Sequence, residues 1–117
     1  MAKKKSRSRS SKAQQDELVF KALANKDRRQ ILDLLRDAHR NTGELCESLP
    51  HLNRCTVMQH LGKLEKANLI LVKREGKYRW NYLNVEPIQR IYNRWIKDFA
   101  QPAAELLVHL KDELEKG

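Results

Sequence analysis

The chain has 117 residues, 40% of them hydrophobic and 33% charged, with a formal net charge of +9 at pH 7, and this length suits one domain with a modest core. No apolar run approaches the roughly 18 residues that cross a bilayer, and no apolar segment follows the basic N-terminus as a secretory signal requires. The two cysteines are too few for a disulfide framework, so we expect a reducing cytoplasm and no membrane partner.

The positive charge is concentrated at the N-terminus. Six of the 24 basic residues precede the first acidic residue, Asp16, and the other 18 are nearly balanced by 15 acidic residues. Residues 1–12 have no apolar period, so we expect a disordered basic tail followed by one domain over residues 13–117. The tail is either a solvated end or an arm that adds sequence-independent contacts with phosphates.

Apolar residues at helical spacing predict two helices in the first third of the chain. The first covers residues 14–24. Asn25 is a typical N-cap, and the helix that follows it has one apolar face, formed by Ile31, Leu34, Leu35 and Ala38. We expect Thr42 to cap a short helix over residues 43–49, and residues 50–52 to form a turn.

The next helix carries residue types that suit DNA. Asn53 is its expected N-cap and Ala67 its approximate end. Its apolar stripe is formed by Val57, Leu61 and Leu64. The opposite face offers donors and acceptors for base edges and phosphates, namely Arg54, Thr56, Gln59, His60 and Lys63. Asn68 is expected to end the helix, because asparagine is second only to glycine in tolerating a left-handed backbone there.

Two short strands, residues 69–74 and 78–83, are predicted by their aliphatic and aromatic residues, with a glycine-containing turn between them. Basic residues cluster around this turn, namely Lys73, Arg74, Lys77 and Arg79. A helix, a turn, a second helix and a basic hairpin in this order are the layout of a winged helix-turn-helix, which inserts its second helix into the DNA major groove. We therefore predict a mainly α fold of five or six helices with a two-stranded β-hairpin wing.

The chain is predicted to be helical again from Val85 to its end, with a break near residues 100–102 because of Pro102. Apolar residues recur along this segment at helical spacing and need a surface to cover them. A second copy of the chain is the simplest cover, with help from the first helix. The expected dimer interface comprises Leu18, Ile91, Tyr92, Trp95, Phe99, Leu106 and Leu110.

Several segments match the motifs of a known family. Residues 22–32 resemble the A-L-A-(D/N)-x-x-R-R-x-I-L opening of ArsR-type bacterial transcriptional repressors. Residues 57–70 resemble their V-x-x-H-L-x-x-L-x-x-A-G-L-(I/V) signature, with Asn68 in place of the glycine, and residues 74–83 resemble their wing. Residues 87–96 resemble the branch that has a P-I-x-x-I-x-x-R-W-I segment after the wing.

The resemblance covers roughly residues 16–99 and has functional implications. It implies a homodimer built from the first and last helices, which represses by occluding a promoter. It also implies that a small-molecule inducer releases the DNA. Members of this branch are often encoded beside START-like lipid-binding proteins and have no recognised metal site.

Metal-sensing relatives carry a Cys-x-Cys pair before the turn or a His/Asp site on the last helix, and this chain has only part of each. Cys46 has no neighbouring thiol, and Cys55 lies on the next helix. Asp98, His109 and Asp112 supply half of the terminal site, whereas zinc takes three or four ligands. We therefore expect no metal and no other cofactor. A thiol redox switch is an alternative to inert packing of the cysteines.

The chain contains no P-loop, Rossmann fingerprint or nucleophile elbow, so we expect no catalytic residue and no enzymatic activity. The sequence predicts instead a homodimeric, sequence-specific repressor that binds a palindrome in double-stranded DNA, in the bacterial cytoplasm at the nucleoid. The expected DNA contacts are Arg28, Arg54, Thr56, Gln59, His60, Lys63, Arg74, Lys77 and Arg79. Two alternatives are a winged-helix protein-interaction module and a nonspecific basic-tailed DNA-binding protein.

Overall fold

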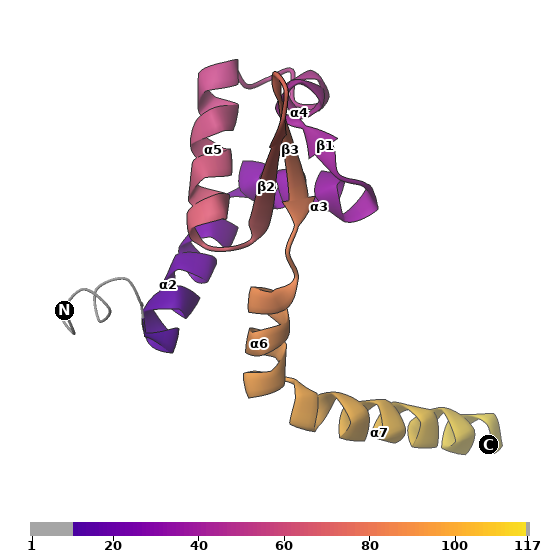
Figure 1. Cartoon of the computed structure of the whole chain (residues 1–117). Helices are drawn as coiled ribbons and strands as arrows, with labels where there is room; N and C mark the ends of the chain where they lie inside the picture. Colours follow the sequence, from indigo (N-terminus) through magenta and orange to yellow (C-terminus); the bar gives the residue numbers. More distant parts are fainter. Residues whose placement is uncertain (1–10, 117) are drawn as a thin grey trace. The chain divides into compact units, whose positions relative to one another are not determined.

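The computed structural model of the chain describes residues 11–116, except for the side chains of residues 99–104 and 106. Figure 1 shows the order of its helices and strands. They are α2 (Lys12–Leu23), α3 (Lys26–Asp37), β1 (Arg40–Asn41), α4 (Thr42–Ser48), α5 (Arg54–Lys66), β2 (Ile70–Glu75), β3 (Tyr78–Leu83), α6 (Glu86–Trp95) and α7 (Lys97–Lys116).

The chain divides into two units, the first ending at Pro87 and the second starting at Ile88. The first unit holds α2 to α5 and the sheet, and the second holds α7 and most of α6. The predicted mainly α fold is confirmed, with six helices and a small antiparallel sheet of three strands among the described residues. Among the described residues, no helix is long and apolar enough to cross a membrane.

Helix α2 starts at Lys12 rather than at residue 14, because Ser11 forms a capping box with Gln14. Ser11 Oγ accepts from the Gln14 N–H at 3.1 Å, and Gln14 Oε1 accepts from the Ser11 N–H at 3.0 Å. Ser11 and Lys12 thus belong to the start of α2. The rest of the predicted tail, residues 1–10, lies outside the described residues.

Helix α3 begins as the sequence predicts. The Asn25 side chain caps it by accepting from the backbone N–H groups of Asp27 and Arg28, at 2.9 and 3.1 Å. Ile31 and Leu35 of the predicted apolar face are buried, together with Leu32. Leu34 is half-buried, and Ala38 is exposed because it is the C-cap, so its predicted place on this face is wrong.

The short helix α4 is capped by Asn41, so the prediction that Thr42 caps it is wrong. Asn41 and Glu44 form a capping box with N···O distances of 2.8 and 2.9 Å. Thr42 is the first residue of the helix and is buried, and its Oγ1 donates to the Arg79 carbonyl at 3.5 Å. Asn41 also belongs to β1, a strand of two residues that is too short to show a sequence period.

Strands β2 and β3 form the predicted hairpin, and β1 adds a third strand on the other edge of β3, so the sheet is larger than the two strands expected. Gly76 in the hairpin turn has φ +60°, a left-handed conformation that glycine adopts without strain. In Figure 1 the hairpin runs beside α5, and β1 lies on the side of β3 away from β2. Strand β1, which directly precedes α4, therefore connects the β2–β3 hairpin to the start of that helix.

Helix α5 has the predicted cap and the predicted buried stripe. Asn53 Oδ1 accepts from the Thr56 N–H at 2.8 Å. Val57, Leu61 and Leu64 are fully buried. They belong to an aliphatic core shared by the helices and the sheet of the first unit, which also contains Val19, Ile31, Leu45, Leu49, Leu69 and Ile70. Each of these large side chains contributes about 1.5–3 kcal/mol by leaving water.

Helices α6 and α7 are separated at Ile96, so the break predicted at residues 100–102 is wrong in position. The Ile96 N–H still donates to the Tyr92 carbonyl at 2.9 Å, and α7 starts at Lys97. Pro102 therefore lies within α7, in its second turn.

Asn68 follows the C-terminus of α5 with φ +61°, the left-handed conformation predicted for it. We expect Asn68→Val to lower the free energy of unfolding by about 1–2 kcal/mol, because a β-branched side chain is strained in this conformation. Urea unfolding measures the change. Asn68→Gly is the matched control and should be as stable as the wild type, and equal stability of the valine and glycine variants would contradict the argument.

Candidate nucleic-acid interface

The five residues predicted to read DNA all lie on α5, away from its buried stripe. Arg54, Gln59 and Lys63 are exposed, and Thr56 and His60 are half-buried. Their side chains offer cationic, amide, hydroxyl and imidazole groups along one helix, a set able to bond both base edges and phosphates.

A groove of about 370 Å³ lies between α5, the start of α4 and the wing. Its cationic lining residues are Arg54, Arg74, Lys77 and Arg79. The other lining residues are Asn41, Thr42, Gly43, Met58 and Tyr78. Because the lining holds several cations and no acidic residue, the groove has a positive potential that attracts phosphate groups.

The wing tip presents Arg74 and Lys77 to solvent. Both are exposed, and neither forms an ion pair with any residue in the described part of the chain. Lys77 Nζ lies 5.5 Å from the centroid of the Tyr78 ring, a cation–π contact that steadies the ammonium at the mouth of the groove. These two charges are therefore free to meet an anion.

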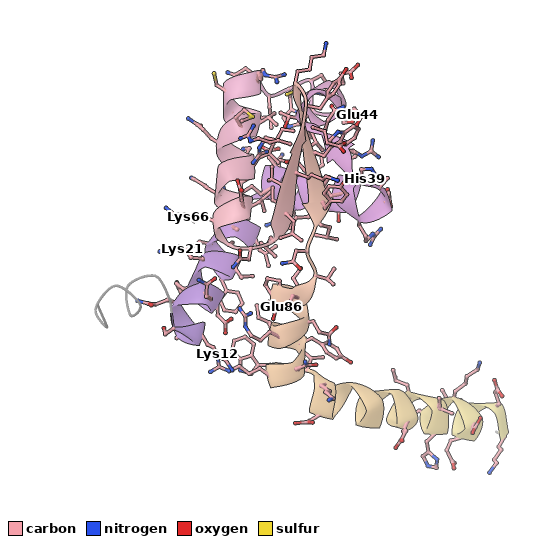
Figure 2. The ribbon with its side chains drawn as sticks, in the orientation of Figure 1. Lys12, Lys21, His39, Glu44, Lys66 and Glu86 are labelled. Carbon is pink, nitrogen blue, oxygen red and sulfur yellow. The ribbon has the colours of Figure 1, made fainter. Side chains whose placement is uncertain are left out.

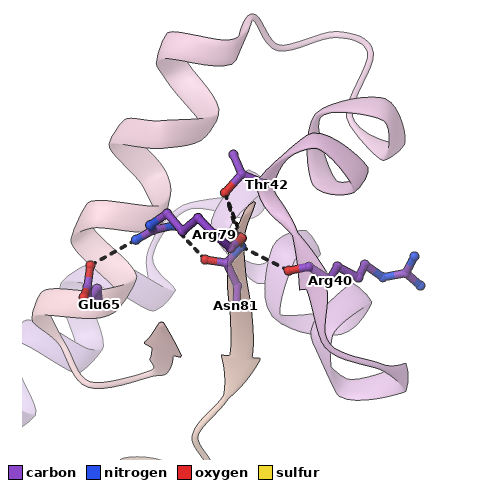
Figure 3. Close-up of polar contacts among 5 residues, drawn as sticks. All are labelled: Arg40, Thr42, Glu65, Arg79 and Asn81. Carbon is purple, nitrogen blue, oxygen red and sulfur yellow. Dashed lines mark hydrogen bonds and ion pairs between the residues drawn. The ribbon is translucent and has the colours of Figure 1, made fainter. Parts of the chain in front are cut away.

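Arg79 is held differently, although it lines the same groove. Its side chain is only 10% exposed, and its Nη2 lies 3.0 Å from Glu65 Oε1 on α5. Its Nη1 donates to Asn81 Oδ1 at 2.7 Å, as Figure 3 shows. The guanidinium thus bridges β3 to α5 and has an internal carboxylate partner.

Asn81 is the centre of this polar cluster and is 0% exposed. Its Nδ2 donates to the Arg40 carbonyl at 3.1 Å, to Thr42 Oγ1 at 3.4 Å and to the Arg79 carbonyl at 3.3 Å (Figure 3). These contacts join β3, β1 and the start of α4, and Arg79 extends them to α5. This cluster therefore connects the wing to α5.

Arg28, predicted to contact the DNA backbone, is 9% exposed. Its Nε donates to the Ala22 carbonyl at 2.8 Å and its Nη2 to the Lys21 carbonyl at 3.1 Å, both near the end of α2. Its Nη1 lies 3.3 Å from His60 Nδ1. All three guanidinium nitrogens are therefore engaged inside the unit, and Arg28 connects α2 to α5.

A second cavity, of about 230 Å³, lies between α2 and α5 in the first unit. Leu18 and Ala22 line it together with the cations Lys21, Arg28, Lys63 and Lys66. Figure 2 shows the Lys21 and Lys66 side chains extending on the same side of the unit, near the ends of their helices. The positive surface of α5 thus continues onto α2.

A hydrogen bond joins the turn before α5 to the start of α3. His51 Nε2 donates to Asp27 Oδ1 at 2.9 Å. This hydrogen bond holds the pKa of Asp27 below its usual value of 3.8. The contact connects the turn that precedes α5 to α3.

Sequence reasoning did not single out Asn81, Glu65, Asp27 or His51. Only Asn81 could have been noticed from the sequence near it. It is a polar residue between two aromatic residues of the same strand, Trp80 and Tyr82, and its side chain points to the opposite face of the sheet from theirs. The partners of the other residues lie far away in the sequence, so no spacing rule connects them.

All described side chains among the predicted dimer-interface residues are exposed or half-buried, namely Leu18, Ile91, Tyr92, Trp95 and Leu110. Those of Phe99 and Leu106 lie outside the described residues. Other large apolar side chains on the last two helices are also exposed, namely Ile88, Leu107, Val108 and Leu114. Such a density of apolar surface is typical of an interaction surface.

Among the described residues, no group of three or more His, Cys, Asp or Glu side chains could hold a metal ion. Cys46 and Cys55 are free thiols. On α7, His109 Nε2 lies 3.9 Å from Glu113 Oε1, one turn further along the helix.

Comparison with known proteins identifies a family. Residues 25–71 match the family described as "Bacterial regulatory protein, arsR family". The chain is 38% identical over 87 residues to the HTH-type transcriptional regulator YuzN of Bacillus subtilis, covering 68% of this chain and 92% of the relative. It is 32% identical over 81 residues to the transcriptional repressor SdpR of the same species, covering 69% of this chain and 88% of the relative.

A solved structure shares the fold. The chain is similar to the homodimeric winged helix-turn-helix DNA-binding domain of Mb0332 from Mycobacterium bovis, with 28% sequence identity and a TM-score of 0.60. The similarity covers 90% of this chain and 86% of that domain. That protein is described as a possible ArsR-family transcriptional regulator.

We expect Asn81→Ala to lower the free energy of unfolding by about 1–3 kcal/mol, because it removes hydrogen bonds to three elements and leaves buried groups unpaired. Chemical unfolding followed by circular dichroism measures the loss. Asn93→Ala, at an exposed position on α6, is the control and should change stability by no more than about 0.5 kcal/mol. Equal effects of the two substitutions would show that the cluster contributes nothing.

Asp27→Asn should destabilise the fold in a pH-dependent way. Because the pKa of Asp27 is lower in the folded state than its usual value of 3.8, its stabilising contribution is present above that pH. The contribution is lost as the pH falls through the lowered folded-state pKa. Unfolding free energies of the two proteins should therefore differ near neutral pH and converge once the pH is below the lowered pKa of Asp27 in the folded state. Asp33→Asn, on the same helix, controls for the loss of a carboxylate without loss of the His51 contact.

Proposed function

Because this chain belongs to the arsR family of bacterial regulatory proteins, which are winged helix-turn-helix DNA-binding transcription regulators and not enzymes, we propose that it is a homodimeric repressor of a palindromic operator. DNA binding and transcription regulation follow from family membership. Dimerisation, repression and operator symmetry are our proposal.

The observation that carries the proposal is the cationic groove beside α5, with its free Arg74 and Lys77. A wing groove without acidic residues suits the phosphates that flank a major groove occupied by α5. A protein-docking face would be more apolar and aromatic than the polar side of α5.

Two observations support a homodimer. The second unit exposes Tyr92, Trp95 and several aliphatic side chains, a surface that a second copy would bury. The similar Mb0332 domain is itself described as homodimeric. A two-fold dimer would insert its two α5 helices into successive major grooves about 10 bp apart, which requires a palindrome.

Repression is favoured by the similarity to SdpR, which is named as a transcriptional repressor. A dimer bound across a promoter would occlude it. Release by a small-molecule inducer and association with the nucleoid in the bacterial cytoplasm stay predictions.

We divide the predicted DNA contacts by chemistry. Gln59 and Thr56 carry groups that suit base edges, and Arg54 and Lys63 flank them on the same helix. Arg74 and Lys77 suit phosphates or the minor groove beside the wing. Arg79 has an internal carboxylate partner, so its main role would be to hold the wing.

The test of the proposal is selection of binding sites from a random-sequence duplex library by the purified chain. A two-fold motif supports a sequence-specific dimer. Retention of DNA without enrichment would indicate a nonspecific binder, and removal of residues 1–10 should then abolish binding. Failure to retain any DNA would favour a protein-interaction module.

Gln59→Ala and Lys77→Ala should differ in their effects on binding to the selected operator. Gln59→Ala should cost about 1–3 kcal/mol and relax preference at one base pair of each half-site. Lys77→Ala should weaken operator and random DNA alike and lower the salt slope by about 1. Fluorescence anisotropy titrations measure both changes. Gln89→Ala and Lys111→Ala, at exposed positions on α6 and α7, are the matched controls.

A further inference from the structure

We propose that Arg28 fixes His60 as a neutral imidazole with its proton on Nε2, and that this Nε2–H group donates a hydrogen bond to an acceptor atom of DNA. The inference rests on the proposed function, because it requires α5 to lie on DNA. His60 would be the DNA contact, and Arg28 a positioning residue that acts through it.

The tautomer follows from the contact at the other ring nitrogen. His60 Nδ1 lies 3.3 Å from Arg28 Nη1. A guanidinium group has only donors, so Nδ1 must be the acceptor and cannot carry a proton. In a neutral ring the proton is then on Nε2.

Arg28 holds this arrangement because its own position is fixed. Its Nε and Nη2 donate to the Ala22 and Lys21 carbonyls, and its backbone N–H is capped by Asn25. Protonation of His60 Nδ1 would bring a second cation against the guanidinium. Burial lowers the pKa of His60 below its usual value of 6.5, and the charges of Arg28 and Lys63 lower it further, whereas the charge of Asp27 raises it by less than these effects lower it. The ring is therefore neutral at physiological pH.

The Nε2 atom is available to an external partner. Every buried side-chain nitrogen or oxygen in the described part of the chain has a hydrogen-bond partner. His60 Nε2 has no such partner among these residues, so it is not buried. On α5 it lies one turn from both Thr56 and Lys63, two of the predicted DNA contacts. The donor thus opens on the face assigned to DNA.

A neutral donor has a distinct chemistry on DNA. It can bond a phosphate oxygen, or the acceptor atoms of guanine, adenine N7 or thymine O4 in the major groove. It cannot accept from the amino groups of cytosine or adenine. Because it carries no charge, it displaces no counterion, whereas a lysine contact does.

The test uses two substitutions of His60 in the full-length chain, each keeping one ring nitrogen's role. His60→Asn keeps an acceptor near the position of Nδ1 but loses the outer donor. His60→Gln keeps a donor near the position of Nε2 but loses the acceptor for Arg28. His109→Asn, at an exposed position on α7, is the control. Affinity for the selected operator is measured by fluorescence anisotropy over a range of salt concentrations.

His60→Asn should weaken binding roughly five-fold, the loss of one hydrogen bond, with an unchanged salt slope. Equal loss on all sequences identifies a phosphate acceptor, and loss at one base pair of each half-site identifies a base edge. His60→Gln should bind within about two-fold of the wild type. Wild-type affinity of the asparagine variant, or a changed salt slope, would overturn the proposal.

Nitrogen-15 NMR of labelled histidine in the free wild-type chain tests the tautomer without DNA. His60, assigned by the loss of its signals in His60→Asn, should show an unprotonated Nδ1 and a protonated Nε2. In Arg28→Lys the two tautomers should mix, and operator affinity should fall by about two-fold, because the competent tautomer is still populated. A protonated Nδ1 in the wild type would overturn the proposal, whatever the measured affinities for DNA. A wild-type chain that enriches no DNA would instead defeat the proposed function, and the DNA contact with it.

Discussion

The wing can act together with α5 only if the two are held at a fixed separation, and the hydrogen-bonded cluster around Asn81 holds them. A two-stranded hairpin is marginal alone. Here Asn81 bonds the carbonyl of Arg40 on β1 and the hydroxyl of Thr42 on α4, while Arg79 connects it to Glu65 on α5. An apolar residue at this point would fill the core without specifying where the wing lies, whereas a satisfied polar cluster has one arrangement.

Helix α5 is held on its other flank by a second arginine. Arg28 closes the end of α2 and reaches the His60 ring, in the way that Arg79 reaches Glu65 on the wing side. The buried stripe fixes the depth of the helix in the core, and the two guanidinium groups fix its flanks. The outward side of the helix is then left for a partner, with its side chains on a rigid support.

Local rules account for most of what the sequence predicts correctly. The caps at Asn25 and Asn53 and the left-handed Asn68 each depend on residues within one turn. The prediction of Thr42 as the cap is wrong, although the sequence contains the signal for Asn41. Only Asn41 has an acidic residue, Glu44, at the capping-box spacing. Strand β1 and the contacts of Asn81 with Arg40 and Thr42 could not be predicted, since they join residues about forty positions apart.

The same non-local contacts change how the charge of the chain should be read. From the sequence alone, every arginine near α5 and the wing is a potential phosphate contact. In the structure Arg28 and Arg79 direct their donors inward, to carbonyls, an imidazole and a carboxylate. Only cations without such partners, as at Arg74 and Lys77, can exchange counterions for phosphates. If the chain contacts DNA as proposed, the electrostatic part of binding is smaller than the number of basic residues suggests, and more of the selectivity depends on neutral donors and acceptors of α5.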